Sequence, residues 1–252
     1  MRVAIITGAA GGIGAATTKL LLEQGMAVVG VGRDVAKLAA LEDQMAAGDR
    51  LATIAVDIAT DDAPKAIVDF TLERFGSIDV LVNNAGIGSP KPLHETDDDT
   101  LDHFLGIMLR APFRLARDVI VHMKSGSAIV NVTSTFAVIG GRRGGAYSAA
   151  KGGLTSLTMH MACEYGPQGI RSNCVAPGVT MTDMVRARFD DPGFQKMNVD
   201  TTPYPRLGEV EDIASTIAFL CSPGGEFING QTIVVDGGWS NCKYLSPRIL
   251  NS

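Results

Sequence analysis

The chain has 252 residues, of which 46% are hydrophobic and 19% are charged. This composition excludes a disordered chain and allows a sizeable buried core. The 22 basic and 27 acidic side chains give a net charge of −5 at pH 7. That balance argues against a dedicated nucleic-acid-binding protein, because such proteins carry a basic excess.

Targeting and metal-binding patterns are missing from the sequence. No apolar run is long enough for a transmembrane helix, and the apolar part of the first residues is too short for a secretory signal peptide. The four histidines and four cysteines lack the spacings of zinc sites. We therefore expect a cytoplasmic protein with reduced thiols, no membrane contact and no bound metal.

Short apolar runs and helical patterns alternate along the chain. The runs lack the polar alternation of a half-exposed sheet, which favours parallel strands covered on both faces. Predicted strands span Val3–Thr7, Ala27–Val31, Leu51–Val56, Val80–Val82, Ala128–Val132, Ser172–Val175 and Thr232–Val235. The clearest predicted helices span Gly12–Gln24, Val35–Ala47, Ala63–Phe75, Leu101–Met123, Tyr147–Tyr165 and Val210–Leu220. Strand followed by helix, repeated, predicts a doubly wound Rossmann fold: a single parallel sheet of about seven strands with helices on both faces.

One sheet of this size fits the whole chain, so we expect residues 1–252 to form a single domain. The stretch 180–206 breaks the alternation with three prolines and several charges, just after a predicted strand. Ligands bind beyond the carboxyl ends of such strands. We therefore interpret the stretch as a substrate loop that acts as a lid, with an irregular surface loop as the alternative. The tail from about residue 240 is expected either to dock on a neighbouring subunit or to be disordered.

A glycine-rich turn follows the first predicted strand and opens the first predicted helix. Glycines let the backbone turn tightly and approach a pyrophosphate, and the helix amino terminus supplies N–H donors and a positive dipole end. The position of the turn, between the first strand and the first helix, strengthens this interpretation over a turn without a ligand. The residues expected to hold a dinucleotide phosphate here are Gly8, Gly11, Gly12, Ile13 and Gly14.

The end of the second predicted strand indicates which dinucleotide binds. Gly32 leaves room for a 2′-phosphate and Arg33 offers it a guanidinium, so NADP(H) is favoured and NAD(H) stays possible. Asp34 either accepts from the ribose or, as we favour, caps the helix that starts at Val35. After the third strand, Asp57 and Ile58 are expected near the adenine, although Asp57 would be equally ordinary as a helix cap.

The fourth predicted strand ends in Asn83-Asn84-Ala85-Gly86. Small residues at this point let the backbone pass beside a cofactor, and we include Asn84, Ala85 and Gly86 among the residues that contact it. The asparagine side chains can tie neighbouring strand ends together through hydrogen bonds.

A serine, a tyrosine and a lysine are expected to form the reactive centre. Ser134 follows the fifth predicted strand, and Tyr147 and Lys151 are spaced i and i+4, so they share a helix face. A lysine ammonium near a phenol favours the phenolate and lowers the pKa of the tyrosine. The result is a general acid or base for carbonyl reduction or alcohol oxidation, with Ser134 hydrogen-bonded to the substrate oxygen.

In combination, these motifs resemble the short-chain dehydrogenase/reductase family over nearly the whole chain, to about Trp239. The segments that carry the resemblance are Thr7-Gly8-x-x-x-Gly12-Ile13-Gly14, Asn83-Asn84-Ala85-Gly86, Ser134, Tyr147 with Lys151, Arg171-Ser172-Asn173-Cys174-Val175-Ala176-Pro177-Gly178, and Gly230-Gln231 to Asp236-Gly237-Gly238. The last segment looks like the family's final strand, which commonly builds dimers and tetramers, so the resemblance implies a homo-oligomer.

The resemblance also implies roles for individual residues. Tyr147 would give or take the proton on the substrate oxygen, Lys151 would hold the nicotinamide ribose, and Ser134 would polarise the carbonyl. Further residues expected to contact the cofactor at its nicotinamide end are Tyr147, Lys151, Pro177, Gly178, Val179 and Thr182. Hydride would move between the nicotinamide and a ketone or secondary alcohol, either a 3-oxoacyl thioester or a small carbonyl or alcohol substrate.

One position departs from the family pattern. Many relatives carry an asparagine in the helix before the fifth strand, and Met108 stands there in this chain. In the family, the asparagine helps to hold a water that relays protons to the lysine, whereas methionine has no donor and only a weak acceptor. The alternative function is therefore a cofactor-binding protein with weak or no turnover.

Overall fold

The computed structural model describes residues 1–88, 91–187 and 189–250. Within these residues a seven-stranded sheet has the order β3-β2-β1-β4-β5-β6-β7, and all neighbouring strands are parallel. The strands are β1 (Val3–Thr7), β2 (Ala27–Gly32), β3 (Leu51–Ala55), β4 (Val80–Asn83), β5 (Ala128–Val132), β6 (Arg171–Pro177) and β7 (Thr232–Val235). The strand order reverses between β1 and β4, which is where open α/β sheets bind their ligands. The predicted doubly wound Rossmann fold is confirmed.

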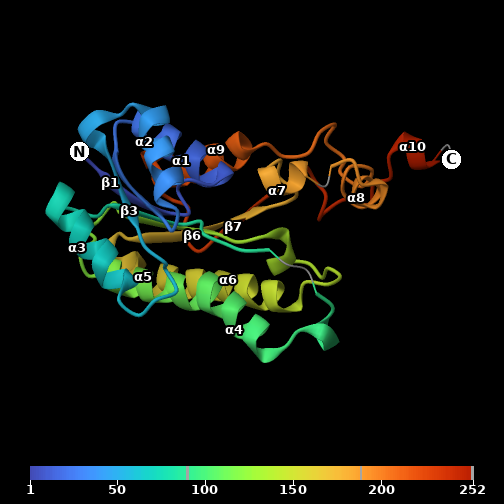
Figure 1. The fold of residues 1–252 in the computed structure, drawn as a ribbon, viewed down its shortest axis with the longest axis horizontal. Coiled ribbons are helices and arrows are strands. Elements are labelled where there is room, and N and C mark those ends of the chain that lie inside the picture. Colours follow the sequence, from blue (N-terminus) through green and yellow to red (C-terminus); the bar gives the residue numbers. More distant parts are fainter. Residues whose placement is uncertain (89–90, 188, 251–252) are drawn as a thin grey trace.

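Helices cover both faces of the sheet (Figure 1). They are α1 (Gly12–Glu23), α2 (Val35–Met45), α3 (Ala63–Phe75), α4 (Asp98–Leu105), α5 (Ala111–Ile120), α6 (Gly145–Tyr165), α7 (Asp183–Arg186), α8 (Pro192–Asn198), α9 (Val210–Cys221) and α10 (Pro247–Leu250). Figure 1 shows α1, α2 and α9 on one face and α3, α4, α5 and α6 on the other, with α7, α8 and α10 beyond one end of the strands. Short 3₁₀ turns are η1 (Gly48–Arg50), η2 (Leu93–Glu95), η4 (Thr135–Ala137), η5 (Gly166–Gln168) and η6 (Pro223–Gly225).

The two faces explain why the apolar runs show no polar alternation. In β1, Ala4 and Ile6 pack against the face of α1 and α9, while Ile5 packs against the face of α3 and α5. Both sets of side chains are fully buried. Successive side chains of a strand point to opposite faces, so a sheet covered on both sides requires apolar residues at every position.

The predicted helix Leu101–Met123 is wrong as a single regular helix. It begins earlier, with α4, passes through a π-helical turn over Gly106–Arg110 and continues as α5. Pro112 supplies the physical reason, since it has no N–H to donate to the carbonyl four residues before it, that of Met108. The other predicted bounds differ from the observed ones by one or two residues, which is the usual fraying of element ends.

The predicted substrate loop, residues 180–206, contains α7 and α8, and residue 188 lies outside the described part. The base of the loop is closed by a bridge between Thr180 and Gly208. The tail was expected to dock on a neighbouring subunit or to be disordered. Up to Leu250 it contacts the loop of its own chain, where Arg248 forms an ion pair with Asp200; docking on a neighbouring subunit stays a prediction, and residues 251–252 lie outside the described part.

No helix among the described residues has the length and apolarity needed to cross a membrane. No three His, Cys, Asp or Glu side chains in the same part of the chain gather where they could hold a metal ion.

A chain of buried amides fixes the strands beneath the site to the helix above them. The Asn83 side chain, at the end of β4, donates to Asn131 Oδ1 of β5 at 2.8 Å, and Asn131 Nδ2 donates to Thr158 Oγ1 of α6 at 2.7 Å. All three side chains are buried. Buried polar groups of this kind stabilise one arrangement, because each loses its partner if an element moves. Asn83 therefore ties strands together as predicted.

We expect Asn131→Ala to lower the free energy of unfolding by about 2–3 kcal/mol, since it leaves the buried Asn83 amide without its acceptor. Urea unfolding followed by circular dichroism measures the change. Gln44→Ala, on the exposed side of α2, is the matched control and should change stability by less than about 0.5 kcal/mol. Equal effects of the two substitutions would contradict the structural role of the amide chain.

Candidate active site

The glycine turn between β1 and α1 admits no side chains at two positions. Gly8 has φ +66°, and a Cβ there would lie 3.0 Å from the Cα of Ala85. A Cβ on Gly14 would lie 2.1 Å from the carbonyl oxygen of Gly8. No side chain caps the start of α1, where Gly11 is the N-cap residue. The turn therefore presents a helix amino terminus, with backbone N–H donors and a positive dipole end, that can bind an anion such as a phosphate.

Asn84 holds the end of β4 against this turn. Its side-chain amide donates to the carbonyls of Thr7 and Gly8 at 3.0 and 3.2 Å. The Thr7 hydroxyl in turn accepts from the backbone N–H groups of Asn84 and Ala85. These bonds place Asn84 and Ala85 directly beside the glycine turn, as expected for residues at one ligand cleft.

At the end of β2, Arg33 lies beside Asp57. Its guanidinium is 3.8 Å from the Asp57 carboxylate, and both side chains are well exposed, at 64% and 42%. Asp57 also accepts from the backbone N–H of Ala59. Sequence analysis did not predict this ion pair, because the two residues lie on different strand ends. The carboxylate partly offsets the charge that Arg33 would offer to a phosphate.

Asp34 caps α2, with its carboxylate accepting from the backbone N–H of Lys37 at 3.1 Å. The favoured interpretation of Asp34 is thus confirmed. At Gly32, a Cβ would lie 3.2 Å from a methyl of Leu38, so the strand end is crowded on the protein side. Asp34 is therefore occupied as a helix cap, and the exposed Arg33 side chain supplies a positive charge at this strand end.

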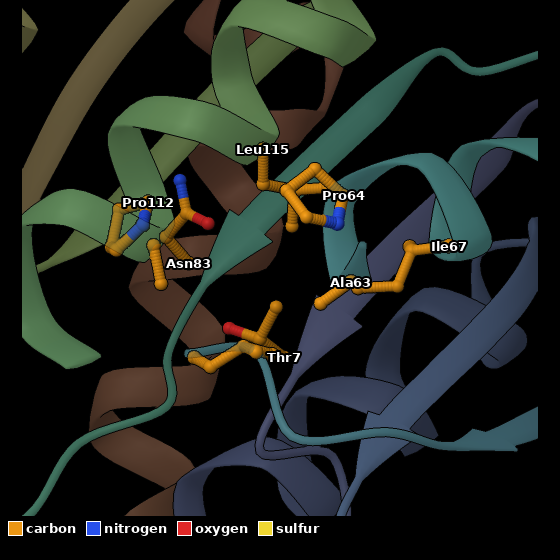
Figure 2. Close-up of a pocket in the computed structure, with 9 residues that line it drawn as sticks. Thr7, Ala63, Pro64, Ile67, Asn83, Pro112 and Leu115 are labelled. Atoms are coloured by element: carbon orange, nitrogen blue, oxygen red, sulfur yellow. The ribbon is translucent and has the colours of Figure 1, made fainter. Parts of the chain in front are cut away.

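A narrow crevice lies between β4, α3 and α5 (Figure 2). Figure 2 shows Thr7 and Asn83 facing apolar side chains of the two helices, among them Pro64, Pro112 and Leu115. It has no room for a water molecule, and its lining is mainly apolar. Ile58 also lines it. We interpret the crevice as imperfect packing under the sheet edge and not as a ligand site.

Ser134, Tyr147 and Lys151 come together beyond the end of β5. Ser134 begins the turn η4, its Oγ accepting from the N–H of Phe136 at 3.2 Å. The Ser134 side chain lies close enough to Tyr147 to act on the pKa of its phenol, in the lowering direction. Lys151 Nζ lies 5.9 Å from the centroid of the Tyr147 ring and donates to the carbonyl of Val132 at 2.7 Å. The structure therefore brings the three predicted residues into one cluster.

Burial sets the protonation of this cluster. Desolvation raises the pKa of the Tyr147 phenol, and the Ser134 side chain acts in the opposite direction without cancelling it. Burial also lowers the pKa of Lys151 from 10.5 to about 8. The prediction that the pKa of Tyr147 falls is therefore wrong for this structure. Its Lys151 ammonium donates to a backbone carbonyl, and burial outweighs the other influences on the phenol.

Met108 lies next to Lys151, in the π-helical turn. Its side chain is fully buried. A Cβ placed on Gly86 would be 3.7 Å from both Lys151 Nζ and Met108 Sδ. Both side chains therefore lie beside Gly86, and Met108 offers no hydrogen-bond donor at this position.

The segment after β6 runs from the end of the sheet toward the glycine turn. Pro177 ends β6, and a Cβ on Gly178 would lie only 2.6 Å from that of Asp236, so the chain is tightly held there. Val179 accepts from the N–H of Gly208. A Cβ on Gly12 would lie 3.6 Å from the Thr182 methyl. The segment thus closes one side of the cleft beside the turn.

Sequence analysis missed an aromatic contact next to Ser134. Phe136 and Trp239 pack edge to face, with ring centroids 6.1 Å apart. The one available signal was that Trp239 is the only tryptophan of the chain and follows a Gly-Gly pair after the last predicted strand. Nothing in the pattern related it to Phe136, which is about a hundred residues earlier.

Comparisons with known proteins agree over nearly the whole chain. Residues 8–240 match the family model described as "Enoyl-(Acyl carrier protein) reductase". The cis-4-hydroxycyclohexanecarboxylate dehydrogenase of Sinomonas cyclohexanicum is 41% identical over 247 residues, which cover 95% of this chain and 96% of the relative.

Solved structures show the same likeness. The short-chain dehydrogenase/reductase SDR:Glucose/ribitol dehydrogenase from Brucella melitensis superposes with a TM-score of 0.90 at 36% identity, covering 94% of this chain and 96% of the other. The 3-ketoacyl-(acyl-carrier-protein) reductase from Brucella melitensis, complexed with NADH, has a TM-score of 0.88 at 34% identity, covering 95% and 98%. Since sequence and fold match along their full length, the chain belongs to the short-chain dehydrogenase/reductase family of oxidoreductases.

Proposed function

We propose that the protein transfers hydride between a nicotinamide cofactor and a ketone or secondary alcohol, with Ser134, Tyr147 and Lys151 as its catalytic residues. The observation that carries the proposal is the cluster of the three side chains: Ser134 lies close enough to Tyr147 to act on its phenol, and the Lys151 ammonium lies 5.9 Å from the centroid of the Tyr147 ring. A relative named as a dehydrogenase and another named as a reductase support chemistry on the alcohol–carbonyl pair.

The residues at the sheet edge fit a dinucleotide. Side chains at Gly8 and Gly14 would clash with neighbouring backbone, so the turn stays tight, and the uncapped start of α1 suits a pyrophosphate. When bound, the cofactor supplies or accepts the hydride. The residues proposed to hold it are Gly8, Gly11, Gly12, Ile13, Gly14, Gly32, Arg33, Asp57, Ile58, Asn84, Ala85, Gly86, Tyr147, Lys151, Pro177, Gly178, Val179 and Thr182.

In the direction of reduction, Tyr147 donates its phenolic proton to the substrate oxygen. Its raised pKa keeps the phenol protonated near neutral pH, which suits a proton donor. The Ser134 hydroxyl donates a second hydrogen bond to the same oxygen and stabilises its developing negative charge. The Lys151 ammonium stabilises the phenolate that remains. The proton on oxygen and the hydride on carbon together complete the alcohol.

The substrate is proposed to lie between the loop after β5 and the substrate loop. Phe136 follows Ser134 closely, and Trp239 packs against it, so part of the wall is apolar and aromatic. This supports a 3-oxoacyl thioester or a small carbonyl or alcohol compound. We also propose a homo-oligomer that uses the β7 edge of the sheet, where every residue of β7 is partly exposed.

Tyr147→Phe is expected to lower kcat by about 10³-fold, because it removes the proton donor and keeps the ring. Turnover is measured on a panel of ketones and secondary alcohols by nicotinamide absorbance. The affinity for the cofactor should stay within about threefold of the unaltered protein. If Tyr147→Phe keeps full activity, Tyr147 is not the proton donor.

Met108 supports the second candidate, a cofactor-binding protein with weak turnover, because a fully buried methionine adjoins Lys151. Met108→Asn in the same panel separates the two functions. If the unaltered protein binds cofactor without turnover and Met108→Asn raises turnover by about 10² or more, the second candidate holds. If the unaltered protein already turns over and Met108→Asn changes little, the oxidoreductase holds.

For the cofactor, we propose NADP(H), with Arg33 binding the 2′-phosphate. NADPH should bind about tenfold more tightly than NADH, or about 1.4 kcal/mol, measured by titration of nicotinamide fluorescence. Arg33→Ala should abolish this difference and leave NADH affinity unchanged. Asp57→Asn should enlarge the difference, since it removes the carboxylate 3.8 Å from the guanidinium. Tighter binding of NADH by the unaltered protein would contradict the role of Arg33.

Lys151→Met should abolish turnover and stabilise the fold near neutral pH. The pKa of Lys151 falls from 10.5 to about 8 on folding, so the buried charge destabilises the protein by about 3 kcal/mol below pH 8. The lost hydrogen bond to Val132 subtracts about 1 kcal/mol, which leaves a gain of about 2 kcal/mol.

The penalty on the buried charge fades as the pH rises from about 8 toward 10.5, because the lysine is then neutral in both states. The stability gain of Lys151→Met should therefore disappear over the same range. Urea unfolding at several pH values measures it. If Lys151→Met has a lower free energy of unfolding than the unaltered protein near neutral pH, the buried ammonium does not destabilise the fold.

A further inference from the structure

The substrate loop, residues 180–206, is anchored at its base. The N–H of Met181 donates to the carbonyl of Gly208 at 2.8 Å, and the N–H of Gly208 donates to Val179. These bonds join the two ends of the loop at its base but do not involve residues 200–204. Within the loop, the hydroxyls of Thr201 and Thr202 donate to the carbonyls of Met197 and Asn198 in α8. These bonds join residues 200–202 to α8, so a hold on the rest of the molecule has to come from another part of the chain.

The segment after β7, residues 236–250, supplies such a hold; we call it the C-terminal segment. The Asp236 carboxylate accepts from the N–H groups of Gly238 and Ser240 at 2.9 and 2.8 Å, which makes a tight turn. A Cβ on Gly237 would lie 3.0 Å from side-chain atoms of both Thr202 and Tyr204. The turn is therefore pressed directly against the far end of the substrate loop.

Trp239 joins this turn to two parts of the active site. Its indole N–H donates to Thr201 Oγ1 in the substrate loop at 2.8 Å. Its ring packs on Phe136, with the ring planes at 61°. The N–H of Phe136 donates to Ser134 Oγ. The Trp239 side chain therefore links Thr201 in the substrate loop to Phe136, which lies two residues after Ser134.

A second hold lies at Asp200, whose side chain is only 8% exposed. The carboxylate accepts from Ser246 Oγ at 2.8 Å and from Arg248 Nε and Nη2 at 3.1 and 2.7 Å. The backbone N–H of Ser246 also donates to the carbonyl of Asp200. A carboxylate with so little exposure needs hydrogen-bonding partners, and here they come from the end of the C-terminal segment. Figure 1 shows α10 beside α8, at the same end of the molecule.

We propose that the C-terminal segment is a brace that fixes residues 200–204 of the substrate loop, and that Trp239 and Arg248 are positioning residues for substrate binding. Neither residue reaches the glycine turn through these contacts, so the brace acts on the substrate side of the cleft. The effect on substrate rests on the proposed oxidoreductase function. The effect on the mobility of the loop is independent of that function.

The first readout needs no activity. Hydrogen–deuterium exchange of the full chain is compared for the unaltered protein, Trp239→Phe and Arg248→Ala. Trp239→Phe keeps an aromatic ring on Phe136 but loses the bond to Thr201. The matched control is Arg74→Ala, which removes an arginine paired with exposed Asp49 far from the loop. We expect about tenfold faster exchange over residues 192–206 in both test variants, with no change in the control or in the sheet.

The second readout is steady-state kinetics on the best substrate of the panel. Both test variants should raise KM about fivefold while kcat and cofactor affinity stay within about twofold, which is the signature of lost substrate positioning. Thr201→Val should raise KM at least as much as Trp239→Phe, because it removes the bond from Trp239 and also the bond from Thr201 Oγ1 to the carbonyl of Met197. The double variant should be no worse than Thr201→Val alone, since the bond to Trp239 is already lost there.

The outcomes are distinguishable. Unchanged exchange over residues 192–206 overturns the brace. Faster exchange with an unchanged KM overturns the positioning role and leaves a purely structural contact. If the unaltered protein turns over no substrate, the proposed function fails, and the exchange comparison still decides whether the brace exists.

Discussion

A parallel sheet covered on both faces restricts where this protein can carry out chemistry. Most strand positions face a core, so few charged side chains lie on the two faces, and the groups that can do chemistry gather beyond the strand ends. The glycine turn follows β1, Arg33 follows β2, Asn84 follows β4 and Ser134 follows β5. Residues from distant parts of the sequence meet at one edge because parallel strands all end on the same side. The buried amide chain through Asn131 keeps that edge in register with α6.

The cluster of Ser134, Tyr147 and Lys151 is an exception to this rule, because it places the Lys151 ammonium in the buried layer between sheet and helix. Lys151 is 4% exposed and has one backbone carbonyl as its hydrogen-bond acceptor. Its pKa of about 8 still leaves it mainly charged near neutral pH, so the fold bears the desolvation of a cation. Burial also raises the pKa of the neighbouring Tyr147 phenol, which keeps it protonated. The buried Lys151 ammonium therefore lowers the free energy of unfolding at the position where the cluster holds a positive charge. Such a loss of stability is common at active sites.

Much of this could be predicted from the sequence. The doubly wound parallel sheet follows from repeated strand–helix units, and the cluster follows from a serine at a strand end with Tyr147 and Lys151 on one helix face. Features that depend on the balance of several contacts could not be predicted. The pKa of Tyr147 rises because burial outweighs the lowering effect of Ser134, and the Arg33–Asp57 pair joins two strand ends whose side chains have no fixed spacing in sequence. The π-helical turn at Met108 had a local signal in Pro112, but helical periodicity alone does not distinguish a π turn from an α turn.

The substrate side of the cleft is built on a different principle from the cofactor side. The glycine turn is fixed by backbone sterics, since side chains at Gly8 and Gly14 would clash with neighbouring backbone. The far end of the substrate loop is fixed by side-chain bonds to Trp239 and Arg248, from the end of the chain. Backbone constraints tolerate few substitutions, whereas side-chain contacts can be exchanged one at a time. A fold organised in this way can keep one mode of cofactor binding while the substrate loop and the C-terminal segment change together, and that separation suits a family whose relatives act on substrates as different as a cyclohexanecarboxylate and a 3-ketoacyl carrier protein.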